Sequence, residues 1–362
     1  MITRGETIGS AAAVALDVRS RDRRAARIEN DAVRVTVLRE GGHIAEILDK
    51  ATGVNPLWTP PWTSIEPSAW SAAAHPEFGS GSDARLLAGI MGHNLCLDIF
   101  GGPSDEEAAA GITAHGEASV AAYDIAADAG ALVLRARLPL AQMIVERRIA
   151  LDGSTAYVRE TITSLTAIDR PIGWTEHVTL GPPFLRRGTT EFRASATRSR
   201  VFESAFGADD YLRPGADFEW PFAPARDGRQ TIDLRRLAGA PASSAYTAHR
   251  MDPDRQAFFV AFSPEAKLAF GYVWSAADFP WMGIWEENAS RTHAPWNGRT
   301  LARGMEFGAS PFPESRRRMV DRGRMFDTPT YRWLPALGTI AVEYRAFVRG
   351  ADAIPESLDV PS

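Results

Sequence analysis

Apolar and polar residues alternate with a period of two along most of this chain from residue 27 onward. Val33, Val35 and Val37 alternate with Arg34 and Thr36, which is the pattern of a strand buried on one face. No long stretch shows the 3.6-residue period of an amphipathic helix. Successive strands without intervening helices indicate an all-β fold, either an antiparallel sandwich or a barrel. The other expected strands cover residues 43–48, 118–125, 131–138, 143–151, 157–162, 174–180, 189–194, 257–262, 268–274 and 339–348.

Two long segments interrupt this alternation. The first, 55–89, carries three tryptophans and several prolines, and the second, 202–255, is rich in Pro, Gly and Asp. Loops of this length in a compact domain usually have a function, and their aromatic residues favour ordered rims around a cleft. The sequence has no internal repeat and no low-complexity linker. We therefore expect one β domain over 27–350, with an N-terminal extension at 1–26 and a C-terminal tail at 351–362.

The composition excludes several classes of protein. With 362 residues, 45% of them hydrophobic, the chain is long and apolar enough to bury a large core. Its net charge of −5 comes with no basic stripe, so no nucleic-acid partner is expected. The single cysteine, Cys96, excludes an internal disulfide and a multi-cysteine metal cluster.

Membrane and targeting signals are not expected either. The sequence contains no run of eighteen apolar residues, and the apolar run at 11–16 is shorter than the core of a signal peptide. These features predict a cytoplasmic protein without a membrane partner. We expect it to be a monomer or a homodimer.

Two of the seven histidines have surroundings that suggest chemistry. His115 precedes Gly116, and a glycine lets the backbone come close to a ligand. His177 lies in the expected strand 174–180, where alternation places it on one face with Thr175 and Thr179. The alternative is that each histidine is a hydrogen-bonded structural residue.

Acidic residues beside glycine and tryptophan form the next candidate group. Glu306 is flanked by Gly304 and Gly308, so its carboxylate can project from a short strand into a pocket, where its pKa would be raised. It can equally be a strand-edge residue paired with a neighbouring arginine. Trp285 and Glu287 combine an indole face with a carboxylate, a pairing that holds sugar rings through their C–H faces and hydroxyl groups.

The order and spacing of these motifs resemble the aldose 1-epimerase (galactose mutarotase-like) superfamily, over 27–349. The first strands end in a Gly-Gly turn at 41–42, and His115-Gly116 is similar to the family's first histidine motif. The hairpin 147–163 leads into the segment 174–177, which ends at a second histidine, and 304–307 is similar to the strand of the catalytic glutamate. The resemblance implies an antiparallel β-supersandwich.

The resemblance also implies an activity, the interconversion of sugar anomers, and a role for each of three residues. Glu306 would be the general base that removes the proton of the anomeric hydroxyl group. His177 would be the general acid that protonates the ring oxygen as the C1–O5 bond opens, and His115 would bind the sugar near that oxygen. The implied substrate is a small carbohydrate, and no metal or organic cofactor is expected.

The sequence departs from the family pattern near the sugar. The family's arginine before the first histidine is replaced within 89–98, where His93 or Asn94 takes its place. Tyr123 stands where a tryptophan is usual, and Asp209 and Asp210 are the candidates for the sugar-binding aspartate. The expected substrate-binding residues are His93, Asn94, Glu117, Trp285 and Glu287.

Other functions remain open at this point. A carbohydrate-binding protein without catalysis would use the same scaffold. A lyase or hydrolase of oligosaccharides would use Glu306 with Glu286 or Glu287, since a glycosidase needs two carboxylates ~5–9.5 Å apart. A sugar-phosphate epimerase would need arginines at the rim of the cleft. A metal site would use His115, Glu117 and His177, ligand types that suit zinc or iron.

Overall fold

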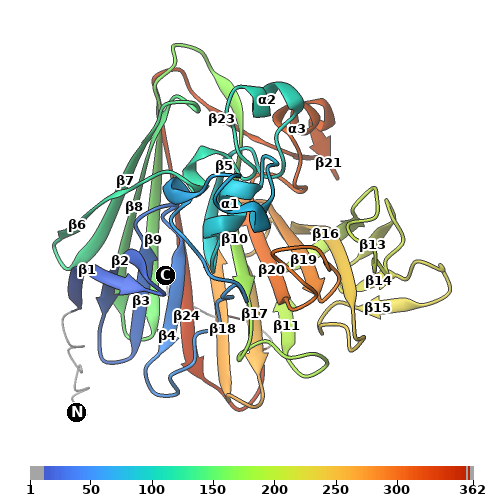
Figure 1. Ribbon diagram of the computed structural model, residues 1–362. Helices are drawn as coiled ribbons and strands as arrows, with labels where there is room; N and C mark the ends of the chain where they lie inside the picture. Colours follow the sequence, from blue (N-terminus) through green and yellow to red (C-terminus); the bar gives the residue numbers. More distant parts are fainter. Residues whose placement is uncertain (1–11, 356–357, 359–362) are drawn as a thin grey trace.

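Two large antiparallel sheets pack against each other in the computed structural model, which describes residues 12–355 and 358 (Figure 1). Buried residues contributed by both sheets form one core cluster, which includes Leu134 and Trp174. The expected all-β, antiparallel sandwich is confirmed. The first sheet contains, in spatial order, β1 (Ala13–Ser20), β2 (Arg23–Glu29), β3 (Val33–Leu38), β4 (Ile44–Asp49), β5 (His93–Asp98), β10 (Arg170–Leu180), β20 (Leu301–Gly308), β19 (Trp281–Asn288), β16 (Ser243–Met251), β12 (Ala196–Val201) and β13 (Asp217–Glu219), with β23 (Arg332–Leu334) paired to β10.

The second sheet is formed by strands from the middle and the end of the chain. Their side chains alternate between the core and the outer face, as in β7, where Leu132 and Leu134 are buried and Arg135 and Arg137 are exposed. The predicted strand 131–138 coincides with β7. In spatial order the sheet contains β11 (Glu191–Ala194), β17 (Ala257–Ser263), β18 (Leu268–Trp274), β24 (Thr339–Gly350), β9 (Thr155–Ser164), β8 (Met143–Asp152), β7 (Ala131–Leu138) and β6 (Asp124–Asp128).

Short elements fill the connections. Figure 1 shows α2 and α3 close together at one end of the sheets. None of the helices in the described residues is long and apolar enough to cross a membrane. The short elements are α1 (Ala84–Gly89), α2 (Asp105–Ala109), α3 (Arg316–Arg322), the 3₁₀ turns η1 (Pro67–Ala69), η2 (Pro76–Phe78) and η3 (Glu117–Ser119), and the hairpins β14 (Phe222–Pro224) with β15 (Thr231–Asp233) and β21 (Arg324–Met325) with β22 (Thr328–Pro329).

The structure corrects three sequence-based boundaries. Residues 118–125 do not form one strand, because the left-handed backbone at His115 (φ 64°) and Gly116 (φ 76°) leads into η3 instead. The expected start of the domain at residue 27 falls inside β2, and β1 extends the same sheet. The segment 202–255, expected to be irregular, contains β16, which is buried on both faces.

Candidate active site

The candidate residues lie on one face of four neighbouring strands in the first sheet. His177 of β10 lies opposite Asn94 of β5. The register between β10 and β20 places Glu306 opposite His177 on the other side. Glu306 in turn lies opposite Gly283 of β19. Because directly opposite residues point to the same face of a sheet, the register alone brings Asn94, His177 and Glu306 into one row.

The centre of this row is a contact between an imidazole and a carboxylate. Nε2 of His177 lies 3.0 Å from Oε1 of Glu306. The other ring nitrogen, Nδ1, lies 3.1 Å from the hydroxyl oxygen of Thr179. When the threonine hydroxyl donates to Nδ1, the ring proton is on Nε2 and faces Glu306. The pair therefore offers one proton donor and one proton acceptor side by side.

Two glycines leave the space that the glutamate occupies. A Cβ atom at Gly304 would overlap Oε1 of Glu306, and one at Gly283 would overlap the hydroxyl group of Tyr246. Tyr246, on β16, donates its hydroxyl to the carbonyl oxygen of Pro311 at 3.2 Å and also lines the cavity described below. Burial and the nearby Glu306 carboxylate raise the pKa of Tyr246 well above its ordinary value. Tyr246 was not predicted, because only the strand register brings it beside Glu306.

His115 reaches the same place from a loop. Its ring centroid lies 4.7 Å from that of His177. The amide nitrogen of Asn94 donates to Nδ1 of His115 at 3.2 Å, which leaves the ring proton on Nε2. Burial, and then the neighbouring His177, lower the pKa of His115 well below its ordinary value. His115 is therefore a neutral hydrogen-bond donor at neutral pH.

These side chains open into a cavity of about 180 Å³. His115, His177, Glu306 and Trp285 all contribute to its wall. Trp285 lies 6.2 Å from Trp296 between ring centroids, in an edge-to-face arrangement. Trp58 and Trp62 extend this aromatic cluster from the segment 55–89. The cavity thus has an acid–base pair on one side and indole rings on another.

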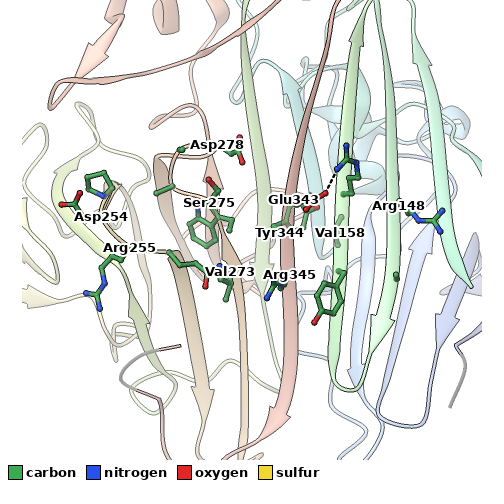
Figure 2. A pocket seen from close by; sticks show the side chains of 18 residues that line it. Arg148, Val158, Asp254, Arg255, Val273, Ser275, Asp278, Glu343, Tyr344 and Arg345 are labelled. Atoms are coloured by element: carbon green, nitrogen blue, oxygen red, sulfur yellow. Dashed lines mark hydrogen bonds and ion pairs between the residues drawn. The ribbon is translucent and has the colours of Figure 1, made fainter. Parts of the chain in front are cut away.

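A larger hollow of about 840 Å³ lies on the second sheet, away from this cavity (Figure 2). Figure 2 shows that charged side chains such as Arg148, Asp254 and Glu343 surround it. None of the described residues that line it is a histidine or one of the expected site residues. His115, His177 and Glu306 therefore line the smaller cavity and not this hollow.

Two of the expected substrate-binding residues do not reach the cavity. His93 precedes Asn94, so it points to the opposite face of β5, where Nε2 donates to Glu176 at 2.8 Å and Nδ1 lies 3.0 Å from the Tyr272 hydroxyl. The carboxylate of Glu117 accepts the backbone N–H groups of Leu140 and Ala141, both at 2.9 Å. The structure corrects both expectations: His93 is a core residue, and Glu117 holds a turn.

The other three expected substrate-binding residues differ in whether they reach the cavity. Trp285 lines the cavity, and Asn94 acts on it through His115. Glu287 is not part of the wall, because its carboxylate accepts the N–H groups of Ser290 and Arg291.

Three further residues named in the sequence analysis, Glu286, Asp210 and Tyr123, have structural roles away from the cavity. Glu286 lies on the core face of β19, where it accepts hydrogen bonds from Ser243 and from Tyr211. Asp210 accepts hydrogen bonds from the backbone N–H groups of Phe206 and Leu212 and so holds the conformation of this loop. Tyr123 donates to the carbonyl of Ala118 and belongs to the core.

The proposed metal ligands are not brought together. His115 and His177 are neighbours, but the Glu117 carboxylate is occupied by the turn at 140–141. Among residues 12–355 and 358, no group of three His, Cys, Asp or Glu side chains is arranged to hold a metal ion.

Comparison with solved structures identifies the fold. A protein from Klebsiella pneumoniae, provisionally named as an aldose 1-epimerase, has a TM-score of 0.64 at 12% sequence identity, with 94% of this chain and 83% of that chain covered. A galactose mutarotase-like protein from Clostridium acetobutylicum has a TM-score of 0.60 at 11% identity, with 94% and 99% covered. A galactose mutarotase-like protein from Lactobacillus casei has a TM-score of 0.58 at 12% identity, with 90% and 100% covered.

Sequence comparison adds no closer relative. No protein-family model matches the sequence, and a search of the curated proteins finds no match. The identities of the structural matches are low, so the similarity concerns the arrangement of the strands and not the activity. It confirms the resemblance expected from the sequence motifs. The chain has the galactose mutarotase-like fold.

Proposed function

We propose that this protein interconverts the anomers of a cyclic aldose by general acid–base catalysis. The observation that carries the proposal is the 3.0 Å separation of His177 Nε2 and Glu306 Oε1 at the wall of a cavity. Opening a cyclic hemiacetal needs a base for the anomeric hydroxyl and an acid for the ring oxygen. Both oxygens are bonded to C1, so the two catalytic groups must lie close together, as these two do.

The reaction runs through an open-chain aldehyde. The carboxylate of Glu306 accepts the proton of the anomeric hydroxyl, and the C1–O1 bond becomes a carbonyl. The C1–O5 bond breaks with its electron pair on O5, and His177 acts as the imidazolium, which donates its Nε2 proton to that oxygen and becomes a neutral imidazole. Rotation about C1–C2 exposes the other face of the aldehyde. The ring then closes with the roles reversed, so His177 and Glu306 end in their starting protonation states.

His115 and Trp285 complete the proposed site. A neutral His115 donates from Nε2 and so stabilises the charge that develops on the ring oxygen. Its orientation depends on the hydrogen bond from Asn94. The face of Trp285 packs against the C–H face of the ring. Acid and base catalysis each contribute ~10²–10⁴ in rate when the groups are correctly positioned.

A hydrolase with the same residues is less well supported. It would need a second carboxylate ~5–9.5 Å from Glu306. Glu286 is on the opposite face of β19. Gly283 lies opposite Glu306, and Glu287 comes four residues after Gly283 on the same strand. Glu287 is therefore about 13 Å further along the strand than the position opposite Glu306.

Saturation-transfer NMR tests the proposal against simple carbohydrate binding. Exchange between the α and β anomers is measured for a panel of free aldoses, with wild type compared to Glu306→Gln and to Glu343→Gln. Glu343 is exposed on the second sheet and serves as the matched control. We expect faster exchange with wild type and Glu343→Gln and a loss of at least ~10² with Glu306→Gln. Binding without faster exchange would identify a carbohydrate-binding protein.

A further inference from the structure

One cation in the cavity wall has hydrogen-bond donors that the protein does not use. Arg291 comes three residues after the end of β19 and lines the cavity together with Trp285 and Trp296. Within the described residues, 12–355 and 358, its side chain makes no hydrogen bond, and its ion pair joins Nε to Oε2 of Glu287 at 3.4 Å. The two terminal nitrogens, Nη1 and Nη2, can therefore donate to a ligand.

The Arg291 guanidinium is held in place by two indole rings and a carboxylate. Its central carbon lies 4.6 Å from the ring centroid of Trp296 and 5.4 Å from that of Trp285, distances at which a cation is attracted to an aromatic face. Oε1 of Glu287 accepts the backbone N–H groups of Ser290 and Arg291 at 2.8 and 3.0 Å. Glu287 is not in the cavity wall, but it orients a residue that is.

A ligand would supply what this cation lacks. Burial lowers the pKa of Arg291 below its ordinary value, and the nearby Glu287 and Asp83 carboxylates oppose this effect only in part. The guanidinium is still charged at neutral pH, and hydrogen bonds from a charged donor are stronger than those from a neutral one. Nε1 of Trp285 is a second buried donor without a partner in the described part of the chain.

The strand register places these donors relative to the catalytic pair. Trp285 comes two residues after the position opposite Glu306, and Glu287 comes two residues later on the same face of β19. The ring centroid of Trp285 lies 5.9 Å from that of His177. Arg291 lies beside Glu287, one step further along the strand. The acid–base pair, the indole and the guanidinium therefore follow one another along the sheet.

This order matches the shape of an aldopyranose. In a six-membered sugar ring, the C3–C4 bond is opposite the C1–O5 bond. A ring that has its C1–O5 bond at His177 and Glu306, and its C–H face on Trp285, directs C3 and C4 toward Arg291. The terminal nitrogens of a guanidinium form a planar fork that suits two oxygens on adjacent carbons. Asp83, an exposed residue of the cavity wall, can accept a proton that such hydroxyl groups donate.

We infer that Arg291 is a specificity-determining residue, which donates hydrogen bonds to the hydroxyl oxygens on C3 and C4 of an uncharged aldopyranose. This inference rests on the proposed anomerase function and specifies which groups of the substrate the site recognises. A sugar that lacks one of these oxygens leaves a donor of a buried cation unpaired. The loss of a hydrogen bond to a charged group commonly costs ~10-fold or more in binding.

Sugars that lack one hydroxyl group test the inference with the wild-type protein. We would measure kcat/KM for anomer exchange with D-glucose and D-galactose, and then with the 3-deoxy, 4-deoxy and 6-deoxy forms of the faster one. Removal of the C3 or C4 hydroxyl should lower kcat/KM by ~10-fold or more. Removal of the C6 hydroxyl, which is not on the C3–C4 edge, should change it little. Equal values for the parent sugar and its 3-deoxy and 4-deoxy forms would overturn the inference.

A pair of variants shows whether the guanidinium is the cause. Arg291→Met removes the charge and the donors but keeps an unbranched side chain, and Arg159→Met makes the same change at an exposed arginine of the second sheet. The penalty for a missing C3 or C4 hydroxyl should disappear in Arg291→Met and persist in Arg159→Met. The hemiacetal 2-hydroxytetrahydropyran has neither hydroxyl, so wild type and Arg291→Met should exchange it equally fast. The wild-type series does not depend on either variant folding.

The outcomes separate this inference from the proposed function. Slower exchange of 2-hydroxytetrahydropyran by a folded Arg291→Met variant would show that Arg291 acts on the acid–base pair and not on the C3 and C4 oxygens. A preference for D-glucuronate over D-glucose that is lost in Arg291→Met would assign the guanidinium to a carboxylate. Either result overturns the inference and leaves the anomerase activity standing. If no hemiacetal in the panel exchanges faster with the protein than without it, both are wrong.

Discussion

Glu176 and His177 are adjacent in the sequence, but their side chains lie on opposite faces of β10. His177 faces the cavity, where it contacts Glu306. Glu176 faces the core, where it accepts hydrogen bonds from Trp174 at 2.9 Å and from His93 at 2.8 Å. One strand therefore carries both a candidate catalytic group and part of a buried polar network.

Removing His93 should affect stability, and removing Asn94 should affect catalysis. His93→Gln breaks hydrogen bonds in the core and should lower the free energy of unfolding by ~1–3 kcal/mol, with KM unchanged. Asn94→Ala removes the donor to His115 and should lower kcat/KM by ~10-fold. Urea unfolding and anomer-exchange kinetics measure the two effects. A changed KM in His93→Gln would contradict the assignment of His93 to the core.

The orientation of His177 should depend on Thr179. Thr179→Val removes the hydroxyl beside Nδ1 and should lower kcat by ~10-fold, because the ring loses the hydrogen bond that orients Nε2 toward Glu306. Thr175→Val is the matched control on the same strand and face. The Thr175 hydroxyl has no hydrogen-bond partner in the described part of the chain. Equal losses of kcat in the two variants would show that Thr179 has no special role.

Glycine at position 304 should be required for activity. Gly304→Ala places a Cβ where Oε1 of Glu306 lies, so the carboxylate must move. We expect a loss of ~10² in kcat, since a displacement of about 1 Å has effects of that size. Gly239→Ala is the control, because a Cβ there meets no atom within 4 Å. Activity near the wild-type level in a folded Gly304→Ala variant would show that the position of Glu306 is not critical.

The buried network should make stability depend on pH through Glu160. Burial is the main cause that raises the pKa of Glu160 from 4.5 to about 7 in the folded protein. Below pH 4.5 the group is protonated in both the folded and the unfolded chain. As the pH rises through about 7, folding must bury a carboxylate that the unfolded chain exposes to water, and stability is lost.

A variant isolates this contribution from those of other groups. Glu160→Gln keeps an oxygen that can accept from Arg147 and Tyr344 but cannot ionise. The stability of wild type relative to Glu160→Gln should fall by on the order of 3 kcal/mol between pH 4.5 and pH 8. Urea unfolding at several pH values measures this difference, with Glu343→Gln as the exposed control. A difference that does not vary with pH would contradict the raised pKa.

Much of the fold was predictable from the sequence, because half-buried strands show their alternation directly. The strands β7, β8 and β9 were found in this way, with a turn at Asp152-Gly153 between the last two. Alternation does not reveal β16, because its residues from Ser243 to Met251 are buried on both faces of the strand. The apolar pattern at 118–125 wrongly predicted one strand, because the left-handed turn at His115 and Gly116 leads the chain into a 3₁₀ turn instead.

The candidate site was only partly predictable, for a related reason. Strand alternation correctly separates His177 from Glu176, but it does not show which face of β5 meets the cavity, so His93 and Asn94 could not be told apart. The proximity of Tyr246 and Gly283 to Glu306 arises from the register of β16, β19 and β20. That register is a property of the assembled sheet and has no local signal in the sequence.

The most direct test of the central claim is a double-mutant cycle on His177 and Glu306, with kcat/KM for anomer exchange as the measured quantity. If the two groups act as one acid–base pair, His177→Asn and Glu306→Gln each lose ~10²–10⁴ in rate. The double variant is then hardly slower than either single variant, because residues that act as a unit are not additive. Multiplied losses in the double variant would show that the two residues act independently. Wild-type exchange in either single variant would contradict the claim outright.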